Sequence, residues 1–306
     1  MRRKAVTVDD LAIPVSLVEK LRALNLHLAD QLALFSPLDL AKALEVRLEE
    51  AEALVKRSAE AIGLRRVNLE EALVEEGVKV TTSSRALDNL LGGGVEVGVI
   101  TEFYGGFASG KTQLCHQLCV NVQLPRERGG LELKAVYVDT EGSFRPERVK
   151  EMASALRLNE DDVLRNIVVF QPRSVEEQVK AVKEAGRMSR HVGLLAVDTV
   201  TNLFRVEYGD DVVERQWRLL LHLKDLEEIA AKGVAVVLAN QVVSGPREME
   251  VIPAGGVLME AGLVKVRLSK VREGAWLAKL ENSLCLPEEE VFFKVCKEGV
   301  RDLKET

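Results

Sequence analysis

One segment constrains the fold of this chain more than any other. Residues 105–112 read GGFASGKT and match G-x-x-x-x-G-K-T, the pattern of a phosphate-binding loop. An apolar strand-like run, Val99 to Tyr104, precedes the loop, and a helix-like stretch, Thr112 to Val122, follows it. Such a loop surrounds phosphate oxygens with backbone N–H groups and presents the positive end of a helix dipole to them. The alternative is a glycine-rich turn that matches by chance, but such a turn would not need the flanking strand and helix.

The motif gives its positions separate tasks. Lys111 would neutralise the β- and γ-phosphates of a nucleotide, and Thr112 would ligate Mg²⁺. The glycines would let the backbone approach the phosphates closely. The residues expected to contact the nucleotide are Gly105, Gly106, Phe107, Ala108, Ser109, Gly110, Lys111, Thr112 and Gln113.

From about Lys79 onward, apolar strands alternate with amphipathic helices. This alternation predicts an α/β fold with a mainly parallel sheet covered by helices on both faces. After Gly262, strand-sized pieces indicate antiparallel strands at one edge. The expected elements after the loop helix are strands Ala135–Asp139, Ile167–Phe170, Gly193–Asp198, Val234–Ala239, Leu263–Leu268, Trp276–Leu280 and Val291–Val295, and helices Pro146–Leu156, Val175–Met188 and Val212–Ala230.

The chain before this alternating region has a different, helical pattern. Ser36 and Pro37 suit the start of a helix, because serine caps helices and proline fits the first turn. The helices expected from apolar spacing are Val15–Leu24, Leu38–Leu44 and Glu49–Ile62. We therefore expect a helical domain over residues 1–62, a charged linker with one short helix over 63–78, and the α/β core over 79–306.

Charge and cysteine usage limit the classes of function. The net charge is −6, so DNA contacts must come from a local patch or from backbone amides rather than from the whole surface. Cys115 and Cys119 lie one helical turn apart, and buried thiols are a better interpretation of this pair than a metal site. The sequence offers no signal peptide and no apolar run long enough to span a membrane, which favours a reduced, cytoplasmic setting.

Polar residues follow three of the expected strands, where ligands bind in an open α/β sheet. Asp198 is the candidate to hold Mg²⁺, Glu141 to deprotonate the attacking water, and Gln241 to sense the γ-phosphate. Each has a simpler alternative. Asp198 could contribute to a helix cap with Thr199, Glu141 could be a turn carboxylate before Gly142, and Gln241 could be a solvated loop residue.

Longer runs carry a resemblance beyond the loop itself. These runs are Leu90–Glu96, Ile100–Gly105, Ser109–Leu118, Asn121–Pro125, Val138–Gly142, Phe144–Arg148, Asn240–Val242 and Gly255–Gly256. They closely resemble archaeal RadA, of the RecA recombinase superfamily, and the resemblance extends over nearly the whole chain.

The resemblance implies a RecA-like ATPase core with a small helix-hairpin-helix domain before it. It implies an ATP-binding, DNA-dependent ATPase of homologous recombination and DNA repair, which polymerises on single-stranded DNA with ATP between adjacent protomers. Lys111 and Thr112 would hold phosphates and Mg²⁺, and Glu141 would activate water. Arg148 would stack near the adenine, although Arg145 and Arg148 also fit as helix surface charges. Gln241 would report the γ-phosphate to the DNA-binding loops.

Several segments depart from the RadA pattern, mainly in DNA binding and assembly. Ala108 replaces a glycine, with less freedom of φ. The first DNA loop, Glu207–Val212, is short and carries two aspartates that would repel phosphates. The other departures are the short second loop at about Ser244–Ala254 with Arg247 as its only cation, Glu260–Gly262 in place of a His-Ala-Ser stretch, Leu69–Ala72 without the aromatic anchor of assembly, and the turns Leu24–Leu26 and Leu44–Val46 without glycine.

These observations leave three functional hypotheses. The first is a recombinase that binds single-stranded DNA and self-associates. The second is a RadA paralogue that modulates recombination through ATP and protein partners, including RadA-like recombinases, without forming long filaments. The third is a nucleotide-switched interaction protein with little affinity for DNA.

Overall fold

The computed structural model describes residues 6–33, 35–62, 77–244, 251–253, 258 and 263–303. The chain divides into two units between residues 76 and 77. Several sequence expectations lie outside the described residues: the linker residues 63–76 with Leu69–Ala72, Arg247, and Glu260–Gly262. Within the part that the structure describes, no helix is both long enough and apolar enough to cross a membrane.

The N-terminal unit is helical, and its apolar residues face a common core. Leu21, Leu40 and Leu54 come from three different helices and are almost completely buried together. The side-chain oxygen of Ser36 accepts a hydrogen bond from the backbone N–H of Asp39 at 3.2 Å, as the Ser-Pro pair predicts. Its elements are η1 (Val8–Leu11), α1 (Val15–Ala23), α2 (Ala29–Ala33), α3 (Pro37–Leu44) and α4 (Leu48–Ile62). Apolar spacing did not indicate α2, which has only five residues.

The two glycine-free turns of this unit keep a backbone geometry that glycine favours. Asn25 has φ +59° and Glu45 has φ +51°. The backbone N–H of Leu26 donates to Leu21 O at 2.9 Å, and that of Val46 donates to Ala41 O at 3.1 Å. Each turn is therefore closed by hydrogen bonds to the helix that it terminates.

Within the described residues of the core, nine strands form one sheet in the order β13-β12-β11-β10-β3-β7-β6-β4-β5. The six strands from β10 to β5 in this order are parallel, and β11, β12 and β13 are antiparallel additions. The strands are β3 (Ile100–Gly105), β4 (Lys134–Asp139), β5 (Ile167–Phe170), β6 (Val192–Asp198), β7 (Ala235–Asn240), β10 (Val264–Arg272), β11 (Ala275–Asn282), β12 (Glu290–Cys296) and β13 (Gly299–Asp302).

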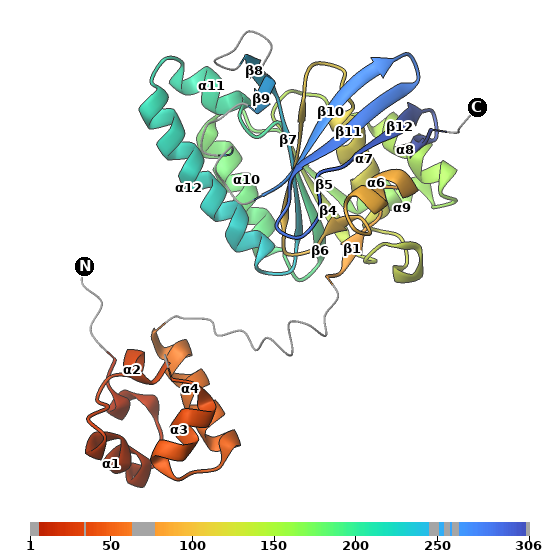
Figure 1. Ribbon diagram of the computed structural model, residues 1–306. Helices are drawn as coiled ribbons and strands as arrows, with labels where there is room; N and C mark the ends of the chain where they lie inside the picture. The colour runs from red at the N-terminus through yellow and green to blue at the C-terminus, as the bar shows by residue number, and fades with distance from the viewer. Residues whose placement is uncertain are drawn as a thin grey trace. The chain divides into compact units, whose positions relative to one another are not determined.

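Helices cover both faces of this sheet (Figure 1). Alternate residues of β6 point to opposite faces, so Leu194 packs into one apolar cluster and Leu195 into the other. The core helices are α6 (Arg85–Leu90), α7 (Lys111–Asn121), η2 (Arg126–Arg128), α8 (Pro146–Ala155), α9 (Glu160–Arg165), α10 (Val175–Arg187), α11 (Asn202–Tyr208) and α12 (Val212–Ala230). The α/β architecture with a mainly parallel sheet is thus confirmed.

The structure corrects the sequence interpretation in three places. The piece expected as an antiparallel strand at Leu263–Leu268 is β10, which pairs parallel to β3 and antiparallel only to β11. Apolar spacing shows that a strand exists but does not encode its direction relative to a distant partner. Sequence analysis also omitted the short helices α6, α9 and α11, which have six, six and seven residues, and the four-residue strand β13. Two short ladders lie outside the main sheet, β1 (Lys79–Val80) with β2 (Val95–Glu96) and β8 (Val242–Ser244) with β9 (Val251–Pro253).

Candidate nucleotide-binding site

The phosphate-binding loop connects β3 to α7 in a conformation that depends on glycine. A Cβ atom added to Gly105 would lie 2.2 Å from the carbonyl oxygen of Leu268, so the neighbouring strand β10 excludes any side chain there. Gly110 caps α7 with φ +98°. Ala108 has φ +59°, which means that the loop keeps a left-handed residue at the position where alanine was expected to restrict φ.

The ammonium group of Lys111 binds the loop itself. Its Nζ donates to the carbonyl oxygens of Gly105 and Gly106, both at 2.8 Å, and to Ser109 Oγ at 3.2 Å. Burial lowers the pKa of Lys111, and the nearby carboxylates of Asp198 and Glu141 partly offset this. A cation that is already held beside the loop can be transferred to phosphate oxygens without a large movement of its stem.

Asp198 ends β6 and is almost completely buried, at 1% exposure. Its Oδ2 accepts hydrogen bonds from the Tyr137 hydroxyl at 2.6 Å and from Ser143 Oγ at 3.3 Å. The alternative role in capping a helix does not fit, because α11 begins at Asn202 and its N-cap residue is Thr201, with no side-chain cap hydrogen bond. The carboxylate is therefore fixed at the edge of the sheet by donors from two other segments.

Asp139 lies beside Asp198 in the β4–β6 register and shapes the following turn. Burial raises the pKa of Asp139, but hydrogen bonds from the backbone N–H groups of Ser143 and Phe144 outweigh it, so the net direction is downward. Those bonds measure 2.8 and 3.1 Å. The Asp139 carboxylate thus holds the turn that carries Glu141.

Glu141 faces a polar group from each of two other strand ends. Its Oε1 accepts from Thr199 Oγ1 at 3.0 Å and from Gln241 Nε2 at 2.7 Å. The Oε1 of Gln241 in turn accepts from Arg205 Nη1 on α11 at 3.2 Å. Glu141 and Gln241 are therefore not isolated turn or loop residues, and their network reaches α11. The expected first DNA loop, Glu207–Val212, is shorter in the structure, because Glu207 and Tyr208 end α11 and Val212 begins α12.

A cavity of about 620 Å³ connects these groups with the loop. Its lining includes Glu141, Asp198 and Gln241 together with all nine of the predicted loop residues. The complete lining is Gly105, Gly106, Phe107, Ala108, Ser109, Gly110, Lys111, Thr112, Gln113, Glu141, Ser143, Asp198, Thr199, Gln241, Val242, Trp276 and Val295.

Arg148 lies at the border of this site and does not line the cavity. Its Nε donates to Gln113 Oε1 at 2.7 Å, and its guanidinium also binds Glu151 and the carbonyl oxygens of Cys296 and Lys297. Arg148 therefore joins the loop helix to the β12–β13 turn. Arg145 instead binds carbonyl oxygens of its own turn.

The two cysteines of α7, which sequence analysis interpreted as buried thiols, lie in the apolar core. Cys115 and Cys119 are fully buried free thiols, and burial raises the pKa of both. His116, which lies between them in sequence, accepts from Arg145 N at 3.1 Å and contacts Thr112 O at 2.7 Å through its other ring nitrogen. Since Nε2 accepts, Nδ1 carries the proton and donates to Thr112 O.

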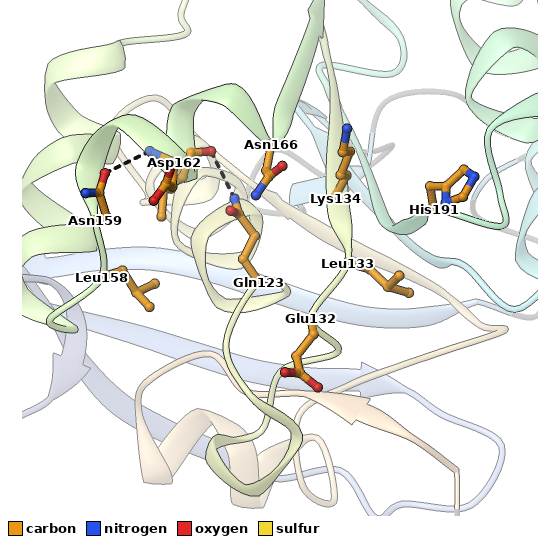
Figure 2. A pocket seen from close by; sticks show the side chains of 10 residues that line it. Gln123, Glu132, Leu133, Lys134, Leu158, Asn159, Asp162, Asn166 and His191 are labelled. Atoms are coloured by element: carbon orange, nitrogen blue, oxygen red, sulfur yellow. Dashed lines mark hydrogen bonds between the residues drawn. The ribbon is translucent and has the colours of Figure 1, made fainter.

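A second cavity, of about 420 Å³, lies at the opposite ends of the strands, near the start of β4 (Figure 2). Lys134, Asn166 and His191 stand at the amino-terminal ends of three strands and contribute to its lining. Gln123 Nε2 donates to Val163 O there at 3.2 Å. None of the predicted site residues lines this cavity.

Sequence reasoning missed several residues of the nucleotide cavity or its supports, among them Tyr137, Ser143, Thr199 and Trp276. Tyr137 and Ser143 bind Asp198, and Thr199 binds Glu141. Thr199 directly follows the predicted carboxylate Asp198, and Ser143 directly follows the predicted turn at Glu141 and Gly142. Their positions next to predicted site residues could therefore have indicated both. Tyr137 and Trp276 lie inside strands, and nothing in the local pattern distinguishes them from core residues.

The donor set fits a nucleotide together with magnesium. Among the described residues, no group of three or more His, Cys, Asp or Glu side chains could hold a metal ion. Mg²⁺ does not require such a cage, because it retains waters and shares ligands with phosphates. The Thr112 hydroxyl and the Asp198 carboxylate line the same cavity and would supply the protein oxygens.

Comparison with known proteins shows the family of this chain. The sequence profile described as Rad51 matches residues 74–303. The chain is 37% identical over 320 aligned residues to the DNA repair and recombination protein RadA of Metallosphaera sedula, an alignment that covers 99% of this chain and 98% of that protein. Both matches include the phosphate loop and the strand ends described above, and we conclude that this chain belongs to the Rad51 family of RadA-like recombinases.

Proposed function

We propose that this chain is a DNA-dependent ATPase of homologous recombination and repair. Its family consists of ATP-dependent, DNA-binding recombinases that self-associate. The observation that carries the proposal is one cavity that contains the whole phosphate loop together with Glu141, Asp198 and Gln241. A recombinase acts on chromosomal DNA, so we also propose a cytoplasmic location.

The positions of the side chains support a division of labour in ATP hydrolysis. Lys111 would leave the carbonyl oxygens that it now binds and donate to the β- and γ-phosphates. Thr112 and Asp198 would hold Mg²⁺, which neutralises phosphate charge when bound. Arg148, next to Gln113, would flank the base.

Glu141 would act as the general base. Its carboxylate would accept a proton from the attacking water as the γ-phosphoryl group is transferred. Thr199 and Gln241 now donate to the same Oε1, which fixes the direction of the carboxylate. Gln241 would bind the γ-phosphate and exchange its contact with Glu141 for that contact.

Single-stranded DNA would act through the segment between α11 and α12. Arg205 binds Gln241 and lies on α11, whose last residue, Tyr208, directly precedes the connecting residues Gly209–Asp211. Of the two aspartates in that loop, Asp211 accepts a hydrogen bond from Glu214 N at 3.0 Å and caps α12. Asp211 therefore has a structural reason to be acidic that does not involve repelling DNA.

The decisive measurement is ATP hydrolysis with and without single-stranded DNA in wild type and in Glu141→Gln. We expect DNA to stimulate the wild type, and the substitution to lower hydrolysis by roughly a hundred- to a thousandfold while leaving ATP affinity within about twofold. Glu147→Gln, an exposed carboxylate in the first turn of α8, is the matched control and should hydrolyse ATP normally. Normal hydrolysis by Glu141→Gln would remove Glu141 from the mechanism.

A RadA paralogue that works through ATP and protein partners is the second candidate. It is favoured by the left-handed Ala108 in the phosphate loop and by the acidic, short first DNA loop. Electron microscopy of the protein with ATP and single-stranded DNA separates the two candidates. Long filaments formed by this chain alone support the recombinase, whereas filaments that require a RadA-like partner support the paralogue.

A further inference from the structure

The phosphate loop contains one residue whose backbone conformation is costly. Ala108 has a Cβ atom and lies at φ +59°, in the left-handed region that glycine adopts without strain. Its side chain is exposed, so packing of the alanine does not hold it there. The contacts that maintain this conformation must act on the backbone around Ala108.

Trp276 makes such a contact from a distant strand. Its indole Nε1–H donates to the carbonyl oxygen of Ala108 at 3.1 Å. The other end of the same peptide unit, the N–H of Ser109, donates to Gly106 O at 3.3 Å. Because a peptide unit is planar and rigid, holding its oxygen and its N–H fixes its orientation. Lys111 holds the two carbonyl oxygens at Gly105 and Gly106, and Trp276 holds the one at Ala108.

Trp276 is itself fixed by its neighbours in the sheet. It lies on β11 opposite Lys270 of β10 and opposite Phe293 of β12. The Lys270 ammonium is 5.5 Å from the centre of the indole ring, and the Phe293 ring centroid is 6.4 Å away. The ring edge also approaches the loop, since a Cβ atom at Gly110 would lie 3.6 Å from Trp276 Cδ1. The indole of Trp276 thus links the antiparallel strands to the loop, and we call its hydrogen bond to Ala108 O the bracket.

We propose that Trp276 is a positioning residue for nucleoside triphosphate binding, which acts by holding Ala108 in the left-handed conformation. The inference rests on the proposed function, because it concerns the same nucleotide site. The backbone N–H groups of the loop can surround phosphate oxygens only while the loop keeps its shape. Glycine at position 108 would keep that shape unaided, whereas alanine there depends on the indole.

The test is a double-mutant cycle on the full chain, with ATP and Mg²⁺ binding measured by calorimetry. Trp276→Phe keeps an aromatic ring but removes the donor, and we expect its dissociation constant to rise roughly three- to tenfold, the range for one lost neutral hydrogen bond. Ala108→Gly supplies the second background of the cycle, and its own dissociation constant is measured first as the reference for that background. In the Ala108→Gly background, Trp276→Phe should cost less than about twofold, because glycine no longer needs the bracket.

Trp217→Phe is the matched control, since Trp217 is the other tryptophan and lies exposed on α12. It should bind ATP as wild type does. It also leaves Trp276 as the only indole, so the emission of the Trp217→Phe chain should change when ATP saturates the site. An unchanged emission, unaltered affinity of Trp276→Phe, or an equal loss of affinity in both backgrounds would overturn the role of Trp276.

The same series separates this inference from the proposed function. If wild type fails to bind ATP, the proposed function is wrong. If wild type binds ATP and Trp276→Phe binds it equally well, only the role of Trp276 is wrong. Should Trp276→Phe unfold at a much lower temperature than wild type, the fluorescence of the Trp217→Phe chain still decides the question, because that chain keeps the bracket.

Discussion

The N-terminal unit and the core both place a residue with a side chain where glycine would fit the backbone better, and they stabilise it in different ways. Glu45 closes α3 at φ +51°, and its turn is held by bonds from Glu45 N and Val46 N to Ala41 O, within the same helix. Ala108 lies in the phosphate loop at φ +59°, and its carbonyl oxygen is held by Trp276, 168 residues away in the sequence.

The two left-handed residues differ in whether local or distant hydrogen bonds hold them. A helix end supplies its own acceptors, so the two glycine-free turns of the N-terminal unit depend only on nearby sequence. A loop that must leave its N–H groups available for phosphate cannot use them all internally. It therefore depends on the strands that pack beside it. Substitutions in the core should consequently change nucleotide binding and hydrolysis. The same substitutions should leave the geometry of the turns in the N-terminal unit unchanged.

The largest effect expected from this comparison is the loss of nucleotide binding in Lys111→Ala. Removing a cation that donates to two phosphates should weaken ATP binding by roughly a thousandfold. Hydrogen exchange in α3 and α4 should remain unchanged, because the N-terminal unit has its own apolar core. Lys134→Ala, which removes a lysine from the second cavity, is the control and should bind ATP normally. Retained binding in Lys111→Ala would place the phosphates elsewhere.

The next effect concerns pH and distinguishes the two units by their buried charges. Burial raises the pKa of Glu102 on β3 to about 7, although Asn240 Nδ2 donates to its Oε1 at 2.7 Å. The folded core thus retains a proton that the unfolded chain releases above a pKa of about 4.5. The free energy of unfolding should therefore be highest below pH 4.5 as far as this group is concerned, and should fall by up to about 3 kcal/mol as the pH rises through 7.

Glu102→Gln should abolish this fall, which hydrogen exchange across pH 5 to 8 can measure separately in the two units. In the described part of the N-terminal unit, Ser58 is the buried polar residue and no charged side chain is buried. We therefore expect the exchange-derived stability of α4 to stay nearly constant over that range. A pH-dependent loss in Glu102→Gln equal to that in wild type would assign it to another group.

A smaller effect tests the first DNA loop of the core. Asp211→Ala should destabilise α12 by about 1 kcal/mol through loss of its N-cap, whereas Asp211→Asn should retain the cap and remove the charge. If the carboxylate repels DNA, Asp211→Asn should bind single-stranded DNA more tightly, with thermal unfolding close to wild type. Equal DNA affinity in wild type and Asp211→Asn would show that this aspartate serves the helix alone.

The smallest effects address the left-handed residues directly. Glu45→Gly should raise the free energy of unfolding of the N-terminal unit by about 0.5 kcal/mol, because relief of left-handed strain slightly exceeds the added freedom of the unfolded chain. Lys42→Gly, at an ordinary helical position of α3, should instead lose about 1 kcal/mol. Denaturant unfolding monitored in the N-terminal unit would measure both. Similar losses in the two variants would mean that the backbone at Glu45 carries no strain.

Sequence alone predicted most of the element order and many of the residues that line the candidate nucleotide cavity. Apolar spacing located α12 and β5 with their exact ends, since long periodic or fully apolar segments carry a strong local signal. The G-x-x-x-x-G-K-T pattern located the loop. The polar ends of apolar strands predicted that Asp198, Glu141 and Gln241 lie near it, because parallel strands bring those ends to one edge, and the three residues do line the same cavity. These features depend on residues that are close together in the chain, so the sequence alone is enough to predict them.

Tertiary structure decided the features that depend on distant partners. The parallel pairing of β10 with β3 excludes a side chain at Gly105 and, through β11, brings Trp276 to Ala108. Tyr137 reaches Asp198 only because β4 and β6 lie side by side. A hydrogen bond between residues far apart in the chain depends on how the sheet is assembled, and no local pattern of residues records that geometry.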